Sequence, residues 1–250
     1  MSSSSEAVGH KTVPLRRPPG RPLVVGHRGL RQPHVAENTP AAFAAAAAAG
    51  ADWVELDVRR SADGVAVVHH DPTFGDIDIV ARTARQLAAA GIHSLHEVLV
   101  TMPVRLGVIL EVKNLPGEPD FDEGETVAGL VADAARKLLA GRRLLTSAFS
   151  PLTVAALRDA MPEVATGLVH FDSLGLAAAG EIAVQYGAQI IASHCASPGL
   201  DDRTIAALHR EGLGVMVWTV NEPDRAASLA ALGVDGLLTD DPAALRARLG

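Results

Sequence analysis

The sequence has little cysteine and no long hydrophobic run, and each shortage excludes a class of protein. Cys195 is the single cysteine in 250 residues, so no disulfide can form within the chain and no zinc site can be built from cysteines. The longest apolar stretch, Ala41–Ala49, is too short and too weakly hydrophobic to span a bilayer. We therefore expect a soluble protein of the reducing cytoplasm that makes no stable membrane insertion.

Positive charge is also in short supply. The chain has 22 Lys and Arg against 29 Asp and Glu, which gives a formal net charge of −7. Proteins that bind nucleic acid or anionic membranes mainly through charge need clustered Lys and Arg, so we expect no nucleic-acid partner. A small anionic substrate remains compatible with the sequence, because a few local cations or a metal ion can override the net charge. The oligomeric state is not indicated.

The first part of the chain differs in composition from the rest. Residues 1–22 are rich in Ser, Pro and Arg and lack the apolar segment of a secretory signal. We expect a flexible N-terminal tail over these residues. Residues 23–250 are long enough, and apolar enough, to form a single barrel domain.

Hydrophobic patterning beyond residue 22 indicates repeated βα units. Short β-branched runs alternate with segments of helical length, which predicts a parallel sheet covered by helices. The predicted core strands are Leu23–His27, Trp53–Val58, Gly107–Val112, Arg143–Ser147, Thr166–His170, Gln189–Ser193, Gly214–Thr219 and Gly236–Thr239. The predicted helices are Thr39–Ala49, Glu125–Ala140, Pro151–Met161, Ala177–Tyr186, Asp202–Glu211, Pro223–Leu232 and Pro242–Arg248. Eight such units favour a TIM (β/α)₈ barrel, with a doubly wound open sheet as the alternative.

One stretch between the second and third core strands departs from this pattern. An extra strand is predicted at Val65–His69. The following segment, Asp71–Val100, has no clean pair of strand and helix. We expect a short insertion here that passes over the barrel mouth.

Charged residues and histidines gather at the ends of the predicted strands. In a TIM barrel the chemistry takes place at the carboxyl ends of the strands, so these are the candidate site residues. The first strand, the second strand, the extra strand and the third strand together contribute His27, Arg28, Glu55, Asp57, His69, His70, Asp71, Glu111 and Lys113.

Three of the carboxylates have the spacing of a metal site. Glu55 and Asp57 point to the same face of their strand, about 6 to 7 Å apart, and Glu111 is on a neighbouring strand about 4.8 Å away. Three carboxylates at this distance can surround a hard cation such as Mg²⁺ or Ca²⁺, and without one they would repel each other. A lone Glu-x-Asp pair more often marks a solvated face. Here the alternate positions Val54, Leu56 and Val58 are apolar, and three separate strand ends carry acids together with His, Arg and Lys.

Three of the candidates, Lys113, His69 and His70, also have a plain structural interpretation, which for either histidine is a hydrogen-bonded core position. Lys113 can equally be a salt-bridge partner for one of the carboxylates. For His69 we favour a hydrogen-bonded histidine of the core, which is the common fate of a single histidine.

The order and spacing of the motifs resemble the glycerophosphodiester phosphodiesterase family over about residues 23 to 248. The motifs are Gly26-His27-Arg28-Gly29, Glu37-Asn38-Thr39 followed by Phe43, Gly50-Ala51-Asp52, Glu55-x-Asp57, Asp63-Gly64, His70-Asp71-Pro72, Leu95-His96-Glu97-Val98-Leu99, Glu111-Val112-Lys113, Trp218-Thr219-Val220-Asn221 and Asp235-Gly236-Leu237-Leu238-Thr239-Asp240-x-Pro242. Each is weak alone, and together they are specific.

The resemblance implies a role for each site residue. One divalent cation, Mg²⁺ or Ca²⁺, would be held by Glu55, Asp57 and Glu111. His27 and His70 would form the acid and base pair, and we assign His27 as base and His70 as acid. Arg28 and Lys113 would bind the phosphate, and Trp218 would be a substrate wall or a core residue. Glu37, Asn38 and Asp71 would support these groups. In this role Glu37 would orient Arg28 or its loop, and Asn38 would cap the first helix.

The sequence departs from the family pattern at two places. Ala36 stands where a proline is usual, and Phe74-Gly75-Asp76 replaces the usual Arg-Thr-Thr stretch. The expected activity is hydrolysis of glycerophosphodiesters to glycerol 3-phosphate and an alcohol. The alternatives are a lysophospholipase D-like activity on a lipid, and a catalytically idle barrel that only binds phosphodiesters. The sequence does not identify the head group.

Overall fold

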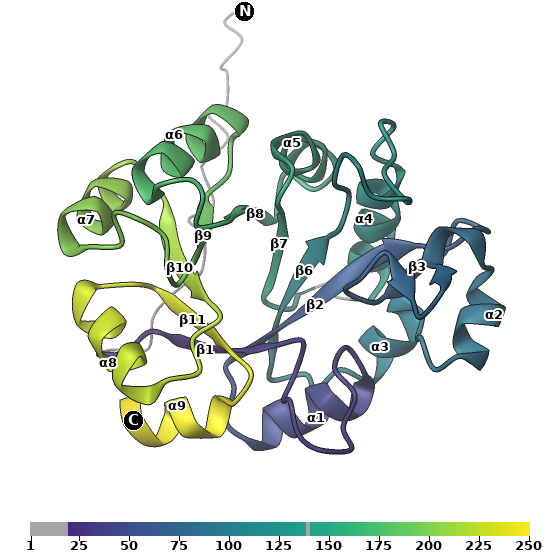
Figure 1. Cartoon of the computed structure of the whole chain (residues 1–250), viewed down its shortest axis with the longest axis horizontal. Helices are drawn as coiled ribbons and strands as arrows, with labels where there is room; N and C mark the ends of the chain where they lie inside the picture. Colours follow the sequence, from purple (N-terminus) through teal and green to yellow (C-terminus); the bar gives the residue numbers. More distant parts are fainter. Residues whose placement is uncertain (1–19, 139–140) are drawn as a thin grey trace, which may run out of the picture.

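The computed structural model describes residues 20–138 and 141–250, which form a closed (β/α)₈ barrel (Figure 1). Neighbouring strands pair in the order β1, β11, β10, β9, β8, β7, β6, β2, and β2 pairs again with β1. This last pairing closes the sheet, so the barrel is confirmed and the open sheet is excluded. The barrel strands are β1 Leu23–His27, β2 Trp53–Arg60, β6 Gly107–Val112, β7 Leu144–Ala148, β8 Ala165–His170, β9 Ile190–His194, β10 Gly214–Trp218 and β11 Gly236–Thr239.

An outer layer of helices covers the strands (Figure 1). It consists of α1 Pro40–Ala48, α3 Leu95–Thr101, α4 Thr126–Leu138, α5 Pro151–Ala160, α6 Leu176–Tyr186, α7 Asp202–Arg210, α8 Pro223–Leu232 and α9 Pro242–Leu249. Residues 139–140 of the predicted helix Glu125–Ala140, and residues 1–19 of the predicted tail, lie outside the described residues. Arg21, also within the predicted tail, pairs with Asp52 at 3.0 Å. No helix among the described residues is long and apolar enough to cross a membrane.

Alternation along the strands divides the apolar residues into two cores. In β2, Val54, Leu56 and Val58 face outward and belong to the large core between strands and helices. Trp53 faces inward and fills the barrel interior with side chains from the other strands. Gly107 on β6 makes room for this ring, because a Cβ there would lie 2.1 Å from it. The next two positions of β2 on this face, Glu55 and Asp57, are therefore left to line the upper part of the barrel.

The prediction for Asp71–Val100 was wrong in one respect, because this segment contains the second helix of the barrel layer. Helix α3 begins after Ser94, whose hydroxyl accepts from the Glu97 N–H, while the Glu97 carboxylate accepts from the Ser94 N–H. Leu95, Val98 and Leu99 are buried in the outer core. The helix was missed because it is short, although the Ser-x-x-Glu capping box marks where it begins.

The rest of the insertion forms a small unit of its own. Strand β3 (Ala66–Val68) pairs antiparallel with β2, and a β4–β5 hairpin follows (Thr73–Phe74 and Ile77–Asp78). A 3₁₀ helix, η1, and helix α2 complete the unit at Ile79–Ala81 and Ala84–Ala89. The unit is organised around a separate apolar cluster that contains Val67, Ile79, Leu87 and Ile92.

Candidate active site

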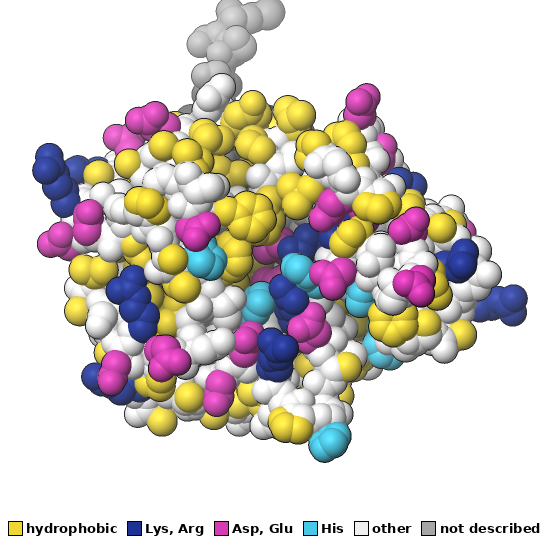
Figure 2. Space-filling model, in the orientation of Figure 1, with side chains coloured by type: hydrophobic (Ala, Val, Ile, Leu, Met, Phe, Trp, Pro, Cys, Tyr) yellow, Lys and Arg dark blue, Asp and Glu magenta, His cyan; other side chains and the backbone are white. Residues whose placement is uncertain are grey.

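The inward-facing residues at the carboxyl ends of the strands divide the barrel mouth into two halves. The side chains from β11, β1, β2 and β6 form what we call the charged half. Those from β7, β8, β9 and β10 form the aromatic half. The charged half contains Asp240, His27, Arg28, Glu55, Asp57, Glu111 and Lys113, and the aromatic half contains Phe149, Phe171, His194 and Trp218. Figure 2 shows charged side chains and histidines gathered around a hollow at the centre of this face, with hydrophobic side chains beside them.

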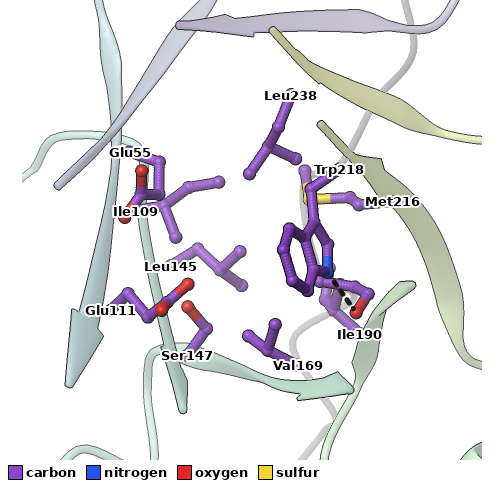
Figure 3. A pocket seen from close by; sticks show the side chains of 11 residues that line it. Glu55, Ile109, Glu111, Leu145, Ser147, Val169, Ile190, Met216, Trp218 and Leu238 are labelled. Carbon is purple, nitrogen blue, oxygen red and sulfur yellow. Dashed lines mark hydrogen bonds between the residues drawn. The ribbon is translucent and has the colours of Figure 1, made fainter. Parts of the chain in front are cut away.

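A pocket lies between the two halves. Glu55 and Glu111 line one side of it with Ser147, and Trp218 stands on the opposite side (Figure 3). Its floor is apolar and includes Leu145, Val169, Ile190, Met216 and Leu238. The carboxylates and the aromatic ring of Trp218 thus lie on opposite sides of the pocket.

Three buried carboxylates come together as their spacing predicts. One oxygen from each of Glu55, Asp57 and Glu111 lies within 4.8 Å of the others, and Asp57 is the register partner of Glu111 across β2 and β6. Glu55 Oε1 is buried and has no hydrogen-bond partner among the described residues. Burial, reinforced by the charges of Asp57 and Glu111, raises the pKa of Glu55 well above its usual range. An all-oxygen donor set with an unpartnered buried atom fits a hard divalent cation.

Asp57 is the most highly connected of the three. Its Oδ1 lies 2.9 Å from Lys113 Nζ, and its Oδ2 accepts from Asn38 Nδ2 at 2.7 Å and lies 3.3 Å from Arg28 Nε. Burial acts to raise the pKa of Asp57, but the charges of Lys113 and Arg28 outweigh it and lower that pKa. Asp57 is therefore held ionised at neutral pH.

Lys113 contacts two of the three carboxylates. Its ammonium pairs with Glu111 as well as with Asp57, and it lies 5.2 Å from the centre of the Phe149 ring. Burial acts to lower the pKa of Lys113, but the neighbouring carboxylates Asp57 and Glu111 outweigh it and raise that pKa. The site therefore contains a permanent cation beside the three carboxylates.

Arg28 begins the loop after β1 in a left-handed backbone conformation, with φ of 57°. This conformation is uncommon for a residue with a side chain and often occurs at functional sites. The Arg28 N–H donates to Glu55 Oε2 at 3.0 Å, and its guanidinium donates to Glu37 Oε1 at 2.8 Å. Asn38, which also has a positive φ, lies against Asp57 and does not cap α1; Thr39 caps that helix.

The two candidate catalytic histidines have the same arrangement. His27 Nδ1 lies 2.9 Å from Asp240 Oδ1, and His70 Nδ1 lies 2.7 Å from Asp71 Oδ1. A carboxylate on Nδ1 fixes the tautomer and leaves Nε2 for proton transfer. Burial lowers the pKa of His70, which favours the neutral ring. The neighbouring His69 instead contacts its own loop, with Nε2 3.2 Å from the Thr73 carbonyl.

Sequence reasoning gave no role to several residues of this site. Asp240 and Asn221, which donates to Asp240 Oδ2 at 2.9 Å, both stand in family motifs, so a search of those motifs for carboxylates could have found Asp240. In the aromatic half, Phe149 and Phe171 stack with ring centres 4.4 Å apart, and Trp218 meets Phe149 edge-on at 5.7 Å. Phe149 follows Ser147 by two positions, so strand alternation could have placed it.

Comparison with known proteins identifies the family to which the sequence is similar. The model of the glycerophosphoryl diester phosphodiesterase family matches residues 27–244. The chain is 26% identical to the glycerophosphodiester phosphodiesterase of Caldanaerobacter subterraneus subsp. tengcongensis over 250 residues, which covers 89% of this chain and 96% of that protein. The match therefore extends across the whole barrel.

Solved structures agree with the fold. A glycerophosphodiester phosphodiesterase from Agrobacterium tumefaciens superposes with a TM-score of 0.69 and 25% identity, and covers 90% of this chain and 99% of that one. A phosphodiesterase from Oleispira antarctica, solved in complex with the product sn-glycerol-3-phosphate, superposes with a TM-score of 0.79 and 22% identity, and covers 91% of this chain and 96% of that one. The matched residues begin at His27, on β1, and continue into α9. This chain belongs to the glycerophosphoryl diester phosphodiesterase family.

Proposed function

We propose that this protein is a metal-dependent phosphodiesterase that hydrolyses small glycerophosphodiesters to glycerol 3-phosphate and an alcohol. One observation carries the proposal, namely three buried carboxylates within 4.8 Å of one another beside a buried lysine, flanked by two histidines that each bind a carboxylate through Nδ1. Family membership supports the same activity.

The substrate phosphate is assigned to the charged half. Arg28 offers a planar set of donors and Lys113 a point charge, both of which bind phosphoryl oxygens. Glu55, Asp57 and Glu111 would hold one divalent cation, Mg²⁺ or Ca²⁺, which would supply further charge neutralisation to the phosphodiester. Glu37 holds the Arg28 guanidinium at 2.8 Å and so limits the directions in which it can donate.

The two histidines carry the protons. His27 takes a proton from the nucleophile, which is either water or the 2-hydroxyl of the glycerol, and His70 gives a proton to the departing alcohol. When the 2-hydroxyl attacks, a cyclic phosphate forms and the alcohol leaves. Water then opens the cyclic phosphate with the histidine roles reversed, and glycerol 3-phosphate is released. Asp240 accepts from Nδ1 of His27, which leaves Nε2 free to take the proton. As the acid, His70 enters the step as an imidazolium with a proton on each nitrogen. Asp71 on Nδ1 stabilises this charged form and opposes the lowering of the His70 pKa by burial.

The alcohol and the carbon chain of the substrate are assigned to the aromatic half. Trp218 is held by a hydrogen bond from its Nε1 to the Ala192 carbonyl at 3.1 Å and presents its ring to the pocket (Figure 3). Phe171 remains 52% exposed beside it. Flat apolar surfaces of this kind accept alcohols of different structure, because they make few directional contacts.

The lipid alternative has less support. A lysophospholipase D-like activity calls for an apolar loop that is open to an acyl chain, but Ile79 and Leu87 of the insertion are buried in their own cluster. Among the described residues of the insertion that precede α3, Phe74 is the large apolar side chain left exposed. A barrel that only binds phosphodiesters is expected to have lost a histidine or a carboxylate, and all five are in place.

Release of glycerol 3-phosphate from glycerophosphocholine and glycerophosphoethanolamine tests the proposal. We expect release that chelator stops, that Mg²⁺ or Ca²⁺ restores, and that His27→Ala lowers about 10² to 10⁴-fold. His69→Ala is the matched control, because it removes a neighbouring histidine that faces its own loop, and it should stay within about twofold of the unaltered protein. Activity that survives complete removal of divalent ions would contradict the proposal.

A further inference from the structure

Arg59 is a buried cation near the site that the proposed chemistry does not use. It lies on β2 two positions beyond Asp57, where β2 pairs with β3, and its side chain is only 1% exposed. A buried arginine is expensive to desolvate unless its donors are met by carboxylates or carbonyls. Its contacts therefore show what the fold requires it to do.

The Arg59 guanidinium contacts two loops that follow different strands. Its Nη1 donates to both carboxylate oxygens of Asp120, at 2.8 and 2.7 Å, and to Glu118 at 2.9 Å. Its Nε donates to the backbone carbonyl of His70 at 2.8 Å. The two carboxylates stand in the loop after β6, and His70 stands in the loop after β3.

The loop that carries the carboxylates is itself fixed. Asn114, which follows Lys113 directly, donates from Nδ2 to the Asp122 carbonyl at 3.0 Å and accepts from the Asp122 N–H at 2.8 Å. Asp120 is almost fully buried with Arg59. The guanidinium is consequently held from one side by a rigid loop and can fix the backbone that it touches on the other side.

The His70 side chain has no comparable support. It is 34% exposed, and its ring pairs with Asp71, which is 68% exposed. An exposed pair of this kind contributes little to holding a side chain in one place. A proton donor that must reach a leaving group to within a fraction of an ångström needs a firmer anchor.

We propose that Arg59, held by Asp120 and Glu118, is a positioning residue that fixes the backbone at His70 and thereby aims its imidazole at the leaving alcohol. This inference rests on the proposed function, in which His70 is the general acid. Arg59 does not touch the substrate in this account and acts only through His70.

A double-mutant cycle between Arg59→Gln and His70→Ala tests this coupling. Arg59→Gln alone should lower kcat about 10 to 100-fold, which is the usual effect of removing a residue that orients a site group, and should change KM less than about threefold. In the His70→Ala background the same substitution should lower kcat by less than about twofold, because the group it positions is already gone. Asp120→Asn is a milder change that leaves Glu118 on the guanidinium, and it should lower kcat in the same way but by a smaller factor. It replaces Arg59→Gln in the cycle if Arg59→Gln does not fold.

Arg142→Gln is the matched control. Arg142 donates to the carbonyls of Met102, Pro103 and Leu106, before β7 at the opposite end of the barrel, and should leave kcat within about twofold in both backgrounds. Equal loss of kcat from Arg59→Gln in both backgrounds, or no loss in either, would overturn the inference while His70→Ala alone still showed its own loss. An unchanged kcat in His70→Ala would instead remove the acid role proposed for His70, and the inference with it.

Discussion

The two halves of the barrel mouth are built on the same strand framework and differ in how their side chains are held. In the charged half, each functional group has a named polar partner, such as Asp240 on His27 or Glu37 on Arg28. In the aromatic half, ring-to-ring contacts predominate, and Phe171 stays half exposed. Directional bonds give exact placement, whereas ring stacking gives a surface. The difference suggests that one half is adapted to the reaction and the other to the substrate.

This contrast predicts where kcat and KM will respond. Groups that act on the phosphodiester in the transition state should lower kcat when removed, and groups that contact only the alcohol should raise KM. The four substitutions below are ordered by the size of their expected effect on activity.

Glu55→Gln should give the largest loss. It removes one charge from the carboxylate set and an unpartnered buried oxygen, and we expect kcat to fall about 10³-fold or more, which corresponds to several kcal/mol of lost charge stabilisation. Glu163→Gln, on an exposed loop, is the control and should be silent. Calorimetric titration should show weaker Mg²⁺ or Ca²⁺ binding by the Glu55 variant, and unchanged binding with unchanged kcat would remove Glu55 from the metal set.

Asp240→Asn should have the next largest effect. Asp240 orients His27, and its replacement permits the wrong tautomer of the ring, so kcat should fall about 10 to 100-fold while KM changes little. Asp235→Asn is a matched control, because Asp235 lies 2.8 Å from His209 Nε2 in an aspartate–histidine pair before β11, away from the mouth. A loss in Asp240→Asn that appears in KM and not in kcat would place Asp240 in binding.

Phe171→Ala should act on binding alone. It removes an exposed ring from the aromatic half, and we expect KM for glycerophosphocholine to rise about fivefold, or roughly 1 kcal/mol, with kcat unchanged. Phe74→Ala removes an exposed ring from the insertion and is the control. Lower activity on a lysophospholipid in Phe74→Ala, with glycerophosphocholine unaffected, would favour the lipid alternative.

Asp52→Asn should leave activity unchanged and reduce stability. Asp52 stands before β2 at the opposite end of the barrel, where it accepts from Arg21 and Val24 N–H and pairs with Arg246 on α9 at 2.6 Å. We expect the free energy of unfolding to fall by about 1 to 3 kcal/mol, measured by urea denaturation at pH 7. A drop in kcat at full folding would contradict the separation of the two barrel ends.

The pH dependence of that effect follows from the Asp52 pKa. Burial acts to raise this pKa, but hydrogen bonds from Arg21, Val24 N–H and Arg246 outweigh it and lower the pKa in the folded state. A lowered folded-state pKa stabilises the protein above the unfolded value of about 3.9, and the stabilisation is lost as the pH falls through the folded-state pKa. The stability gap between Asp52→Asn and the unaltered protein should therefore shrink below about pH 4.

The barrel and the charged half could both be predicted from regular patterns in the sequence. The repeated succession of strand and helix predicts the barrel, and the alternation of side chains within a strand predicts the charged half. Strand periodicity places Glu55 and Asp57 on one face, and parallel neighbours bring Glu111 beside them. The capping role suggested for Asn38 depended on the exact start of α1, which periodicity does not determine. Thr39 caps that helix instead, and Asn38 holds Asp57.

Contacts between distant loops could not be predicted in the same way. Arg59 and Asp120 are 61 positions apart and meet only because the loop after β6 folds back over the end of β2. The aromatic half is assembled from four separate strand ends, each of which contributes one ring. A single aromatic residue at a strand end does not indicate which other rings it will contact. These contacts can be recognised only in the folded structure, where closure of the barrel places the strand ends side by side.

The most direct test of the division between the two halves is steady-state kinetics on glycerophosphocholine with the unaltered protein, His27→Ala and Phe171→Ala measured side by side. The account predicts that His27→Ala loses kcat by about 10² to 10⁴-fold and that Phe171→Ala keeps kcat while its KM rises. A loss of kcat in Phe171→Ala as large as that in His27→Ala, with KM unchanged, would contradict it.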